Sequence, residues 1–277
     1  MQEPPRGLRT ISSGNAVRLA RVLSLTAAIL ACACLPAAAA PAAQSVKLGA
    51  TLTPEHLGQG TTIGFNLQID TPAGEIPAPL TEIDLRYPEN LGIATSGLGL
   101  ATCSAARIEA LGPRHCPADS VMGIGSAIAE FPIGPQIAHE TAPVSILRAP
   151  DVNGQLALLL YVTAANPVGV QIALPSLLLP AAAPFGGSVQ IGVPLVPSFP
   201  DSPDVAVVQL TATLGPLGIT YYERIHGRKI AYHPRGLLLP ASCPHGGFPF
   251  AAELSFADGS TASTQTAVPC PEGGRKG

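Results

Sequence analysis

Apolar and polar residues alternate with a period of two along much of this chain, a spacing that places apolar side chains on one face of a β-strand. The alternation covers 63–69, 83–87 and 248–256, and Pro88 ends the second of these stretches. After the third stretch, Asp258-Gly259 precedes a polar, β-prone segment at 261–268. This arrangement predicts a β-hairpin near the end of the chain.

Other stretches are apolar on both faces, at 156–162, 189–193 and 205–214, and their flanking Pro and Gly favour buried strands. One short helix is predicted at 104–111, where Ser104 can cap it and Gly112-Pro113 ends it; we expect it to cover one end of a sheet. The sequence therefore predicts an all-β fold, a β-sandwich with one short helix. Two packed sandwich domains, 44–145 and 146–277, are the alternative.

The first 43 residues have the pattern of a secretory signal peptide. Four arginines precede an apolar stretch at 22–35, and small residues follow it. We expect cleavage between about residues 39 and 43. The apolar stretch is shorter than the roughly 20 residues of a membrane-spanning helix, so no transmembrane segment is expected in the mature chain. An uncleaved anchor and lipidation at Cys32 are the alternatives.

Four cysteines lie beyond the predicted signal peptide: Cys103, Cys116, Cys243 and Cys270. An even number of cysteines in an exported chain predicts two disulfides, because such chains meet an oxidising compartment. Of the three pairings, the sequence-local one is favoured, since Cys243 and Cys270 flank the predicted hairpin. The paired spacings of a four-cysteine zinc site are absent from the sequence.

Composition and charge exclude several classes of partner. The chain has no Trp and 4% aromatic residues, which argues against a stacking surface for carbohydrate or single-stranded nucleic acid. Without residues 1–43, 17 acidic residues face 11 basic ones, so the predicted mature chain has a charge of about −6. A generally basic nucleic-acid binder is therefore not expected.

No motif predicts catalysis or metal binding. The chain lacks a G-x-S-x-G elbow, and 123–127 is expected to be a strand or bulge. His115 and Asp119-Ser120 are close in sequence and are expected to cap and turn the chain. His226, His233 and His245 lack the spacing that places two ligands on one element. We therefore expect no catalytic residue, cofactor or metal, and an enzyme is the less favoured interpretation.

Positive charge is concentrated in one short segment. No Lys or Arg occurs from 149 to 223, and then Arg224, His226, Arg228 and Lys229 follow within six residues. This group is a candidate contact patch for cell-wall polymer or envelope lipid. The same residues also fit an ordinary hairpin tip between two strands, which is the favoured interpretation.

Three stretches together resemble an uncharacterised family of secreted β-rich proteins from high-GC actinobacteria. They are 116–125, with a C-P-x-x-S-x-x-G pattern; Gly227-Arg228-Lys229 leading to Cys243-Pro244; and 248–261, closing on Pro269-Cys270-Pro271. The resemblance covers about residues 100–277, although the Lys-rich character of that group is muted here. It implies secretion and a β-rich fold, and no activity follows from it.

Three functional hypotheses result. The first is a secreted, non-enzymatic protein of the cell envelope with a structural or interaction role. The second is a secreted carrier of an apolar, lipid-like ligand, whose long apolar segments would line a cavity. The third is a secreted hydrolase. A closed core favours the first hypothesis, an apolar tunnel the second, and convergent polar groups the third.

Overall fold

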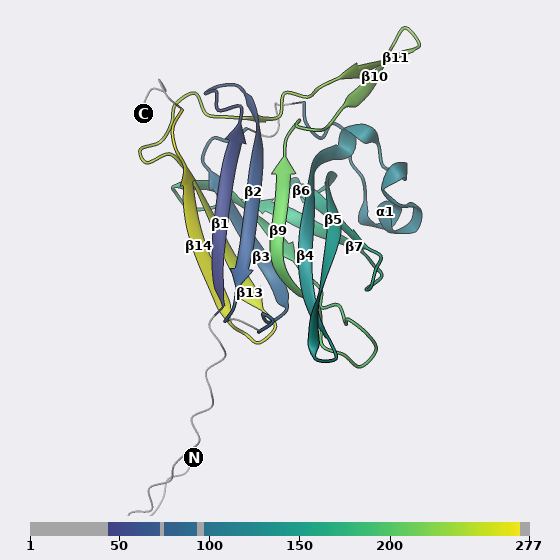
Figure 1. The fold of residues 1–277 in the computed structure, drawn as a ribbon. Helices are drawn as coiled ribbons and strands as arrows, with labels where there is room; N and C mark the ends of the chain where they lie inside the picture. The colour runs from purple at the N-terminus through teal and green to yellow at the C-terminus, as the bar shows by residue number, and fades with distance from the viewer. Residues whose placement is uncertain (1–43, 73–74, 93–96, 272–277) are drawn as a thin grey trace, which may run out of the picture. The chain divides into compact units, whose positions relative to one another are not determined.

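The segments with alternating apolar residues form the strands of one antiparallel sheet (Figure 1). The structure is a computed structural model that describes residues 44–72, 75–92 and 97–271. The predicted signal peptide therefore lies outside the described residues. The strands of the sheet are β1 Ser45–Thr53, β2 Gly60–Asp70, β3 Leu80–Pro88, β4 Val121–Ile133, β5 Gln136–Val152, β6 Gln155–Ala164, β7 Val170–Leu179, β8 Phe185–Gly192, β9 Ala206–Leu214, β12 Leu237–Leu238, β13 Phe248–Phe256 and β14 Thr261–Val268.

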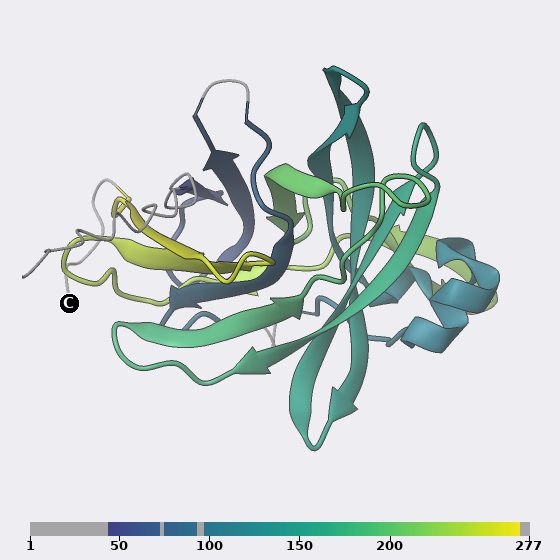
Figure 2. The same cartoon turned by 90° about the horizontal axis from the view of Figure 1, so that it is seen from below.

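The sheet follows a single hydrogen-bonded path in the order β1-β2-β9-β4-β5-β6-β7-β8-β3-β13-β14, and β12 pairs with β2. The two outer strands, β1 and β14, run side by side, and Gln44 Nε2 donates to Ser260 Oγ at 3.2 Å near one end of this seam. The sheet is therefore nearly closed and barrel-like, as the view from below shows (Figure 2).

The two-sheet sandwich is not confirmed, because no break in the described sheet separates two layers. Two strands that pair with partners distant in sequence produce this continuity: β9 lies between β2 and β4, and β3 lies between β8 and β13. Residues 145 and 146, between which the alternative of two domains would divide the chain, lie within strand β5. Strands that precede and strands that follow these residues in the chain belong to the same sheet.

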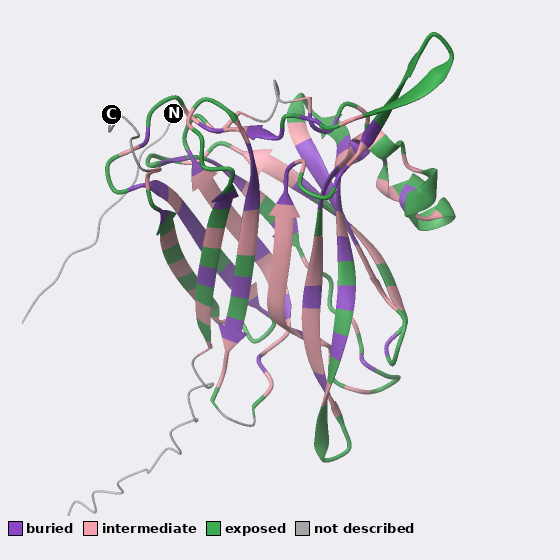
Figure 3. Cartoon of the chain, turned by 45° about the horizontal axis from the view of Figure 1, so that its top comes forward, coloured by how far each residue is buried: buried purple, intermediate pink, exposed green. Residues whose placement is uncertain are grey.

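Alternation places the main core inside the sheet. In β2, Ile63, Leu67 and Ile69 are buried, whereas Asn66 and Gln68 between them are exposed. The same banding is visible along several strands in Figure 3. The sequence-based prediction of strands at 63–69, 83–87, 248–256 and 261–268 is confirmed. The D-G turn between the last two is confirmed as well, with Gly259 at φ 82° and Ser260 N donating to Asp258 Oδ1.

The one α-helix of the described residues, α1 (Ala105–Leu111), covers the outer face of the sheet near β7. Ser104 accepts a hydrogen bond from Arg107 N, and Gly112 at φ 79° ends the helix, as the sequence predicts. Ile108 of the helix packs in a second buried cluster with Leu159 and Tyr161 of β6. Strand β6 is thus buried on both faces, which explains its unbroken apolar run. No helix in the described residues is long and apolar enough to cross a membrane.

Candidate ligand-binding cavity

The interior of the sheet contains two adjoining apolar cavities. The first, of about 130 Å³, lies toward the end of the sheet where β6 meets β7 and β8 leads to β9. The second, of about 90 Å³, lies toward the opposite end, where Leu237 of β12 and Leu214 of β9 line it. Ile83, Leu160, Ile191 and Leu210 line both cavities, so the two share a common wall.

Small side chains on two neighbouring strands leave room for the first cavity. Ala127 of β4 pairs with Ala142 of β5, and both lie on the inner face. Ala129 is the next inward residue of β4 and also lines the cavity. Because alanine fills less volume than the Val, Leu and Ile that make up most of the remaining lining, this part of the sheet is incompletely filled.

Many of the lining side chains are only partly buried although they point inward. Val162, Ile172, Val207 and Leu210 all belong to this group, and each packs against the main core. Partial exposure of inward apolar side chains is what an accessible interior space produces. The lining has the chemistry of a small-molecule pocket, predominantly apolar with very few polar groups.

Glu140 is the single charged residue among the described residues that line either cavity. It pairs with Ala129 across β4 and β5 and is 6% exposed. Its carboxylate accepts two backbone hydrogen bonds, from Asn166 N to Oε1 at 3.0 Å and from Val168 N to Oε2 at 3.1 Å. The side chain thereby ties the loop at 165–169 across the end of the first cavity.

A second loop, at 193–205, closes the same end of the sheet. It contributes Val193, Val196 and Val205 to the cavity lining. The ring of Phe199 in this loop packs edge-to-face against Phe131 of β4, with centroids 6.0 Å apart. The first cavity is thus bounded by two loops that are held by different contacts, one polar and one aromatic.

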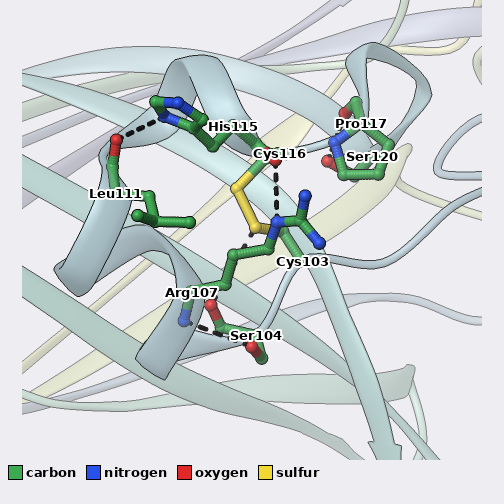
Figure 4. Close-up of a disulfide and its surroundings, with 8 residues drawn as sticks. All are labelled: Cys103, Ser104, Arg107, Leu111, His115, Cys116, Pro117 and Ser120. Carbon is green, nitrogen blue, oxygen red and sulfur yellow. Dashed lines mark hydrogen bonds between the residues drawn. A yellow bond between two sulfur atoms is a disulfide. The ribbon is translucent and has the colours of Figure 1, made fainter.

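The predicted disulfides are both present, with the sequence-local pairing. Cys243 and Cys270 bridge the open end of the β13–β14 hairpin, next to the pair formed by Phe248 and Val268. Cys103 and Cys116 bridge the segment that contains α1 (Figure 4). None of the four cysteines lines either interior cavity.

The serine and histidine near Cys116 have structural partners, shown in Figure 4. The Ser120 hydroxyl is buried and donates to the Pro117 carbonyl at 2.6 Å, in a 3₁₀ turn over Ala118–Ser120. The His115 ring hydrogen-bonds through Nδ1 to the Leu111 carbonyl. The prediction that these residues cap and turn the chain is confirmed. Strand β4 contains 123–127 and has a register shift between Val121 and Gly123, as expected.

The histidines near the basic segment do not form a metal site. Nδ1 of His233 hydrogen-bonds to the Ile219 carbonyl at 3.1 Å. Within the part of the chain that the structure describes, no three His, Cys, Asp or Glu side chains are grouped so that they could hold a metal ion.

The basic patch lies on a separate two-stranded hairpin of β10 (Tyr221–Ile225) and β11 (Arg228–Tyr232), which confirms the predicted hairpin tip. Arg224, His226, Arg228 and Lys229 are all exposed. The hairpin extends beyond the end of the sheet (Figure 3), so the structure does not bring the patch to the cavities.

Sequence reasoning missed the small inner side chains and the role of Glu140. The signal for both was present in β5, where Glu140, Ala142, Val144 and Ile146 occupy alternate positions of one face. A carboxylate on an otherwise apolar face of a strand indicates that hydrogen-bond donors lie beside it, because a buried charge needs hydrogen bonds.

Comparison of the chain with protein-family models, with curated proteins and with solved structures found no match. The described residues form a nearly closed antiparallel sheet with two disulfides and two adjoining apolar cavities in its interior.

Proposed function

We propose that this protein is an exported, non-enzymatic carrier that holds a small apolar ligand inside its sheet. The observation that carries the proposal is the pair of adjoining cavities, whose lining side chains are apolar except for Glu140 and the hydroxyl-bearing Tyr87. The two disulfides are compatible with export, because such bonds persist in oxidising compartments.

The size of the cavities limits the ligand. The first cavity, at about 130 Å³, is close to the about 150 Å³ of an engineered apolar cavity that binds benzene. A ligand that also extends into the second cavity would have about another 90 Å³ of space available. Single aromatic rings and short alkyl chains fit this space, whereas a whole membrane lipid does not.

The charge of the lining limits the ligand further. Glu140 is the one charged group in the lining, and the described lining residues include no Lys, Arg or His. A ligand carboxylate would meet an apolar wall and a like charge, and burying an unpaired charge is costly. A neutral ligand is therefore favoured over a fatty acid.

The direct test is titration of the purified protein with benzene, naphthalene, octanol and octanoate, followed by calorimetry and thermal unfolding. A ligand that binds only the folded state at 100 times its Kd stabilises that state by about 2.7 kcal/mol. We expect the neutral probes to raise Tm and octanoate to have little effect. Native mass spectrometry of the protein from its secreting cell would reveal a co-purifying ligand directly.

A matched pair of variants locates the binding. Ala127→Leu adds three carbons to the wall of the first cavity and should weaken probe binding at least tenfold. Ala110→Leu makes the same change at an exposed helix position and should leave binding unchanged. If none of the probes binds, or if both variants bind them as the parent does, the interior is not a ligand site.

A further inference from the structure

The β10–β11 hairpin has a regular register and a tight turn. Tyr221 pairs with Tyr232, Arg224 with Lys229, and Ile225 with Arg228. His226 and Gly227 form the turn with φ of 48° and 79°. Positive φ at both central residues is the type I′ geometry, whose twist matches that of the two strands and so stabilises a projecting hairpin.

The root of the hairpin is fixed to the body of the protein through Tyr221. This side chain is fully buried, and its hydroxyl accepts from Gly99 N at 2.9 Å and donates to the Val121 carbonyl. Its ring packs edge-to-face against Tyr232, with centroids 5.6 Å apart. The hairpin is therefore held at its base while its tip extends away from the sheet (Figures 1 and 3).

The exposed part of the hairpin has two chemically distinct faces, because cross-strand pairs share a face. One face carries Tyr222, Arg224 and Lys229, and Lys229 Nζ lies 4.0 Å from the centroid of the Tyr222 ring. The other face carries Ile225 and Ile230, which are 40% and 41% exposed, together with Glu223 and Arg228.

The charge of the hairpin is opposite to that of the rest of the chain. Its three cations, Arg224, Arg228 and Lys229, outnumber Glu223, and none of the three forms an ion pair within the described residues. The remainder of the predicted mature chain carries an excess of acidic residues. A negatively charged surface would thus attract the hairpin and repel the body, which orients the protein with the tip first.

We propose that the β10–β11 hairpin docks on an anionic lipid surface, with its cations on the headgroups and its isoleucines and Tyr222 in the interfacial layer. Apolar and aromatic side chains beside cations are what an interfacial segment requires. A polar anionic polymer would use the cations alone and would leave Ile225 and Ile230 in water. The exposed isoleucines therefore favour the lipid surface.

The experiment measures co-sedimentation of the full protein with vesicles of phosphatidylcholine, with and without phosphatidylglycerol. We expect binding only when phosphatidylglycerol is present, and weaker binding as salt increases. Arg228→Gln with Lys229→Gln should weaken binding roughly 30-fold, given the usual contribution of each cation near an anionic bilayer. Ile225→Thr with Ile230→Thr should weaken it roughly tenfold without any change in charge.

The control is Lys47→Gln with Arg86→Gln, which removes the same charge from β1 and β3, outside the hairpin. Lys47 pairs with Asp70, and the half-buried Arg86 pairs with Asp84 and Glu253; because such pairs near the surface contribute little to stability, the variant should fold and bind vesicles as the parent does. Three results would each overturn the proposal: equal loss in this control, full binding by the isoleucine variant, or equally tight binding to dextran sulfate without lipid. None of these measurements depends on a ligand in the cavity.

Discussion

Filling the first cavity should stabilise the protein, and Ala142→Leu is the substitution best placed to do so. Ala142 is 7% exposed, faces Ala127 across β4 and β5, and lines the cavity of about 130 Å³. The change adds three carbons, and each buried methylene contributes about 0.8 kcal/mol. The expected gain in the free energy of unfolding is therefore about 2 kcal/mol.

The measured cost of cavities gives an independent limit on this gain. At about 24 cal/mol per Å³, a cavity of this size corresponds to about 3 kcal/mol of lost stability. A gain of 2 kcal/mol lies within this limit. For a chain of this length it corresponds to a rise in Tm of roughly 4–8 °C.

Urea and thermal unfolding of the parent, Ala142→Leu and the exposed control Ala110→Leu would measure the gain. The control should change stability by less than about 0.5 kcal/mol, as surface substitutions usually do. A loss of 1–3 kcal/mol in Ala142→Leu is the signature of an overpacked core. That result would mean that the interior has no usable space, and the ligand proposal would lose its physical basis.

Three further predictions follow from the buried polar groups. Glu140→Ala leaves the amides of Asn166 and Val168 without their acceptor, so it should lower stability by about 2–5 kcal/mol and speed hydrogen exchange at those two amides. Tyr221→Phe leaves a buried N–H unpaired at the root of the hairpin and should cost about 1–3 kcal/mol in urea unfolding. Burial raises the pKa of Tyr87 and Tyr221 above the usual value near 10, so the folded state keeps these protons longer than the unfolded state. Stability should therefore fall as pH rises beyond about 10, which urea midpoints measured across that range would reveal.

Sequence reasoning succeeded where the determining interactions are local. The β13–β14 hairpin follows from alternation on both strands, the Asp258-Gly259 turn between them and the cysteines outside them. Helix α1 follows from its Ser104 cap and from Gly112 at its end. In each case the residues that decide the structure lie within about 30 positions of one another, so the pattern is visible along the chain.

The closure of the sheet could not be predicted in this way. It depends on β3 pairing with β8 and β13, which lie about 100 and 170 positions further along the chain, and on β1 meeting β14. Alternation shows which face of each strand is apolar but not which strand is its neighbour. The cavity depends on the same pairings, since closure of the sheet brings Ile83 of β3 and Ile191 of β8 into one lining with Ala127 and Ala142.

The first cavity and the β10–β11 hairpin lie at opposite ends of the sheet, and this separation predicts how ligand binding and docking behave together. Strand β9 begins at the loop that bounds the first cavity and ends on the side from which the hairpin extends (Figure 1). At about 3.3 Å per residue its nine residues span about 30 Å. A hairpin docked on a lipid surface would therefore hold the 165–169 and 193–205 loops away from that surface, toward a ligand in solution.

Neither site shares a residue with the other, so ligand affinity should be the same for free and vesicle-bound protein. By linkage, vesicle affinity should then be the same with and without ligand. A measured coupling between them would require a change in the sheet that connects the Tyr221 root to the cavity wall.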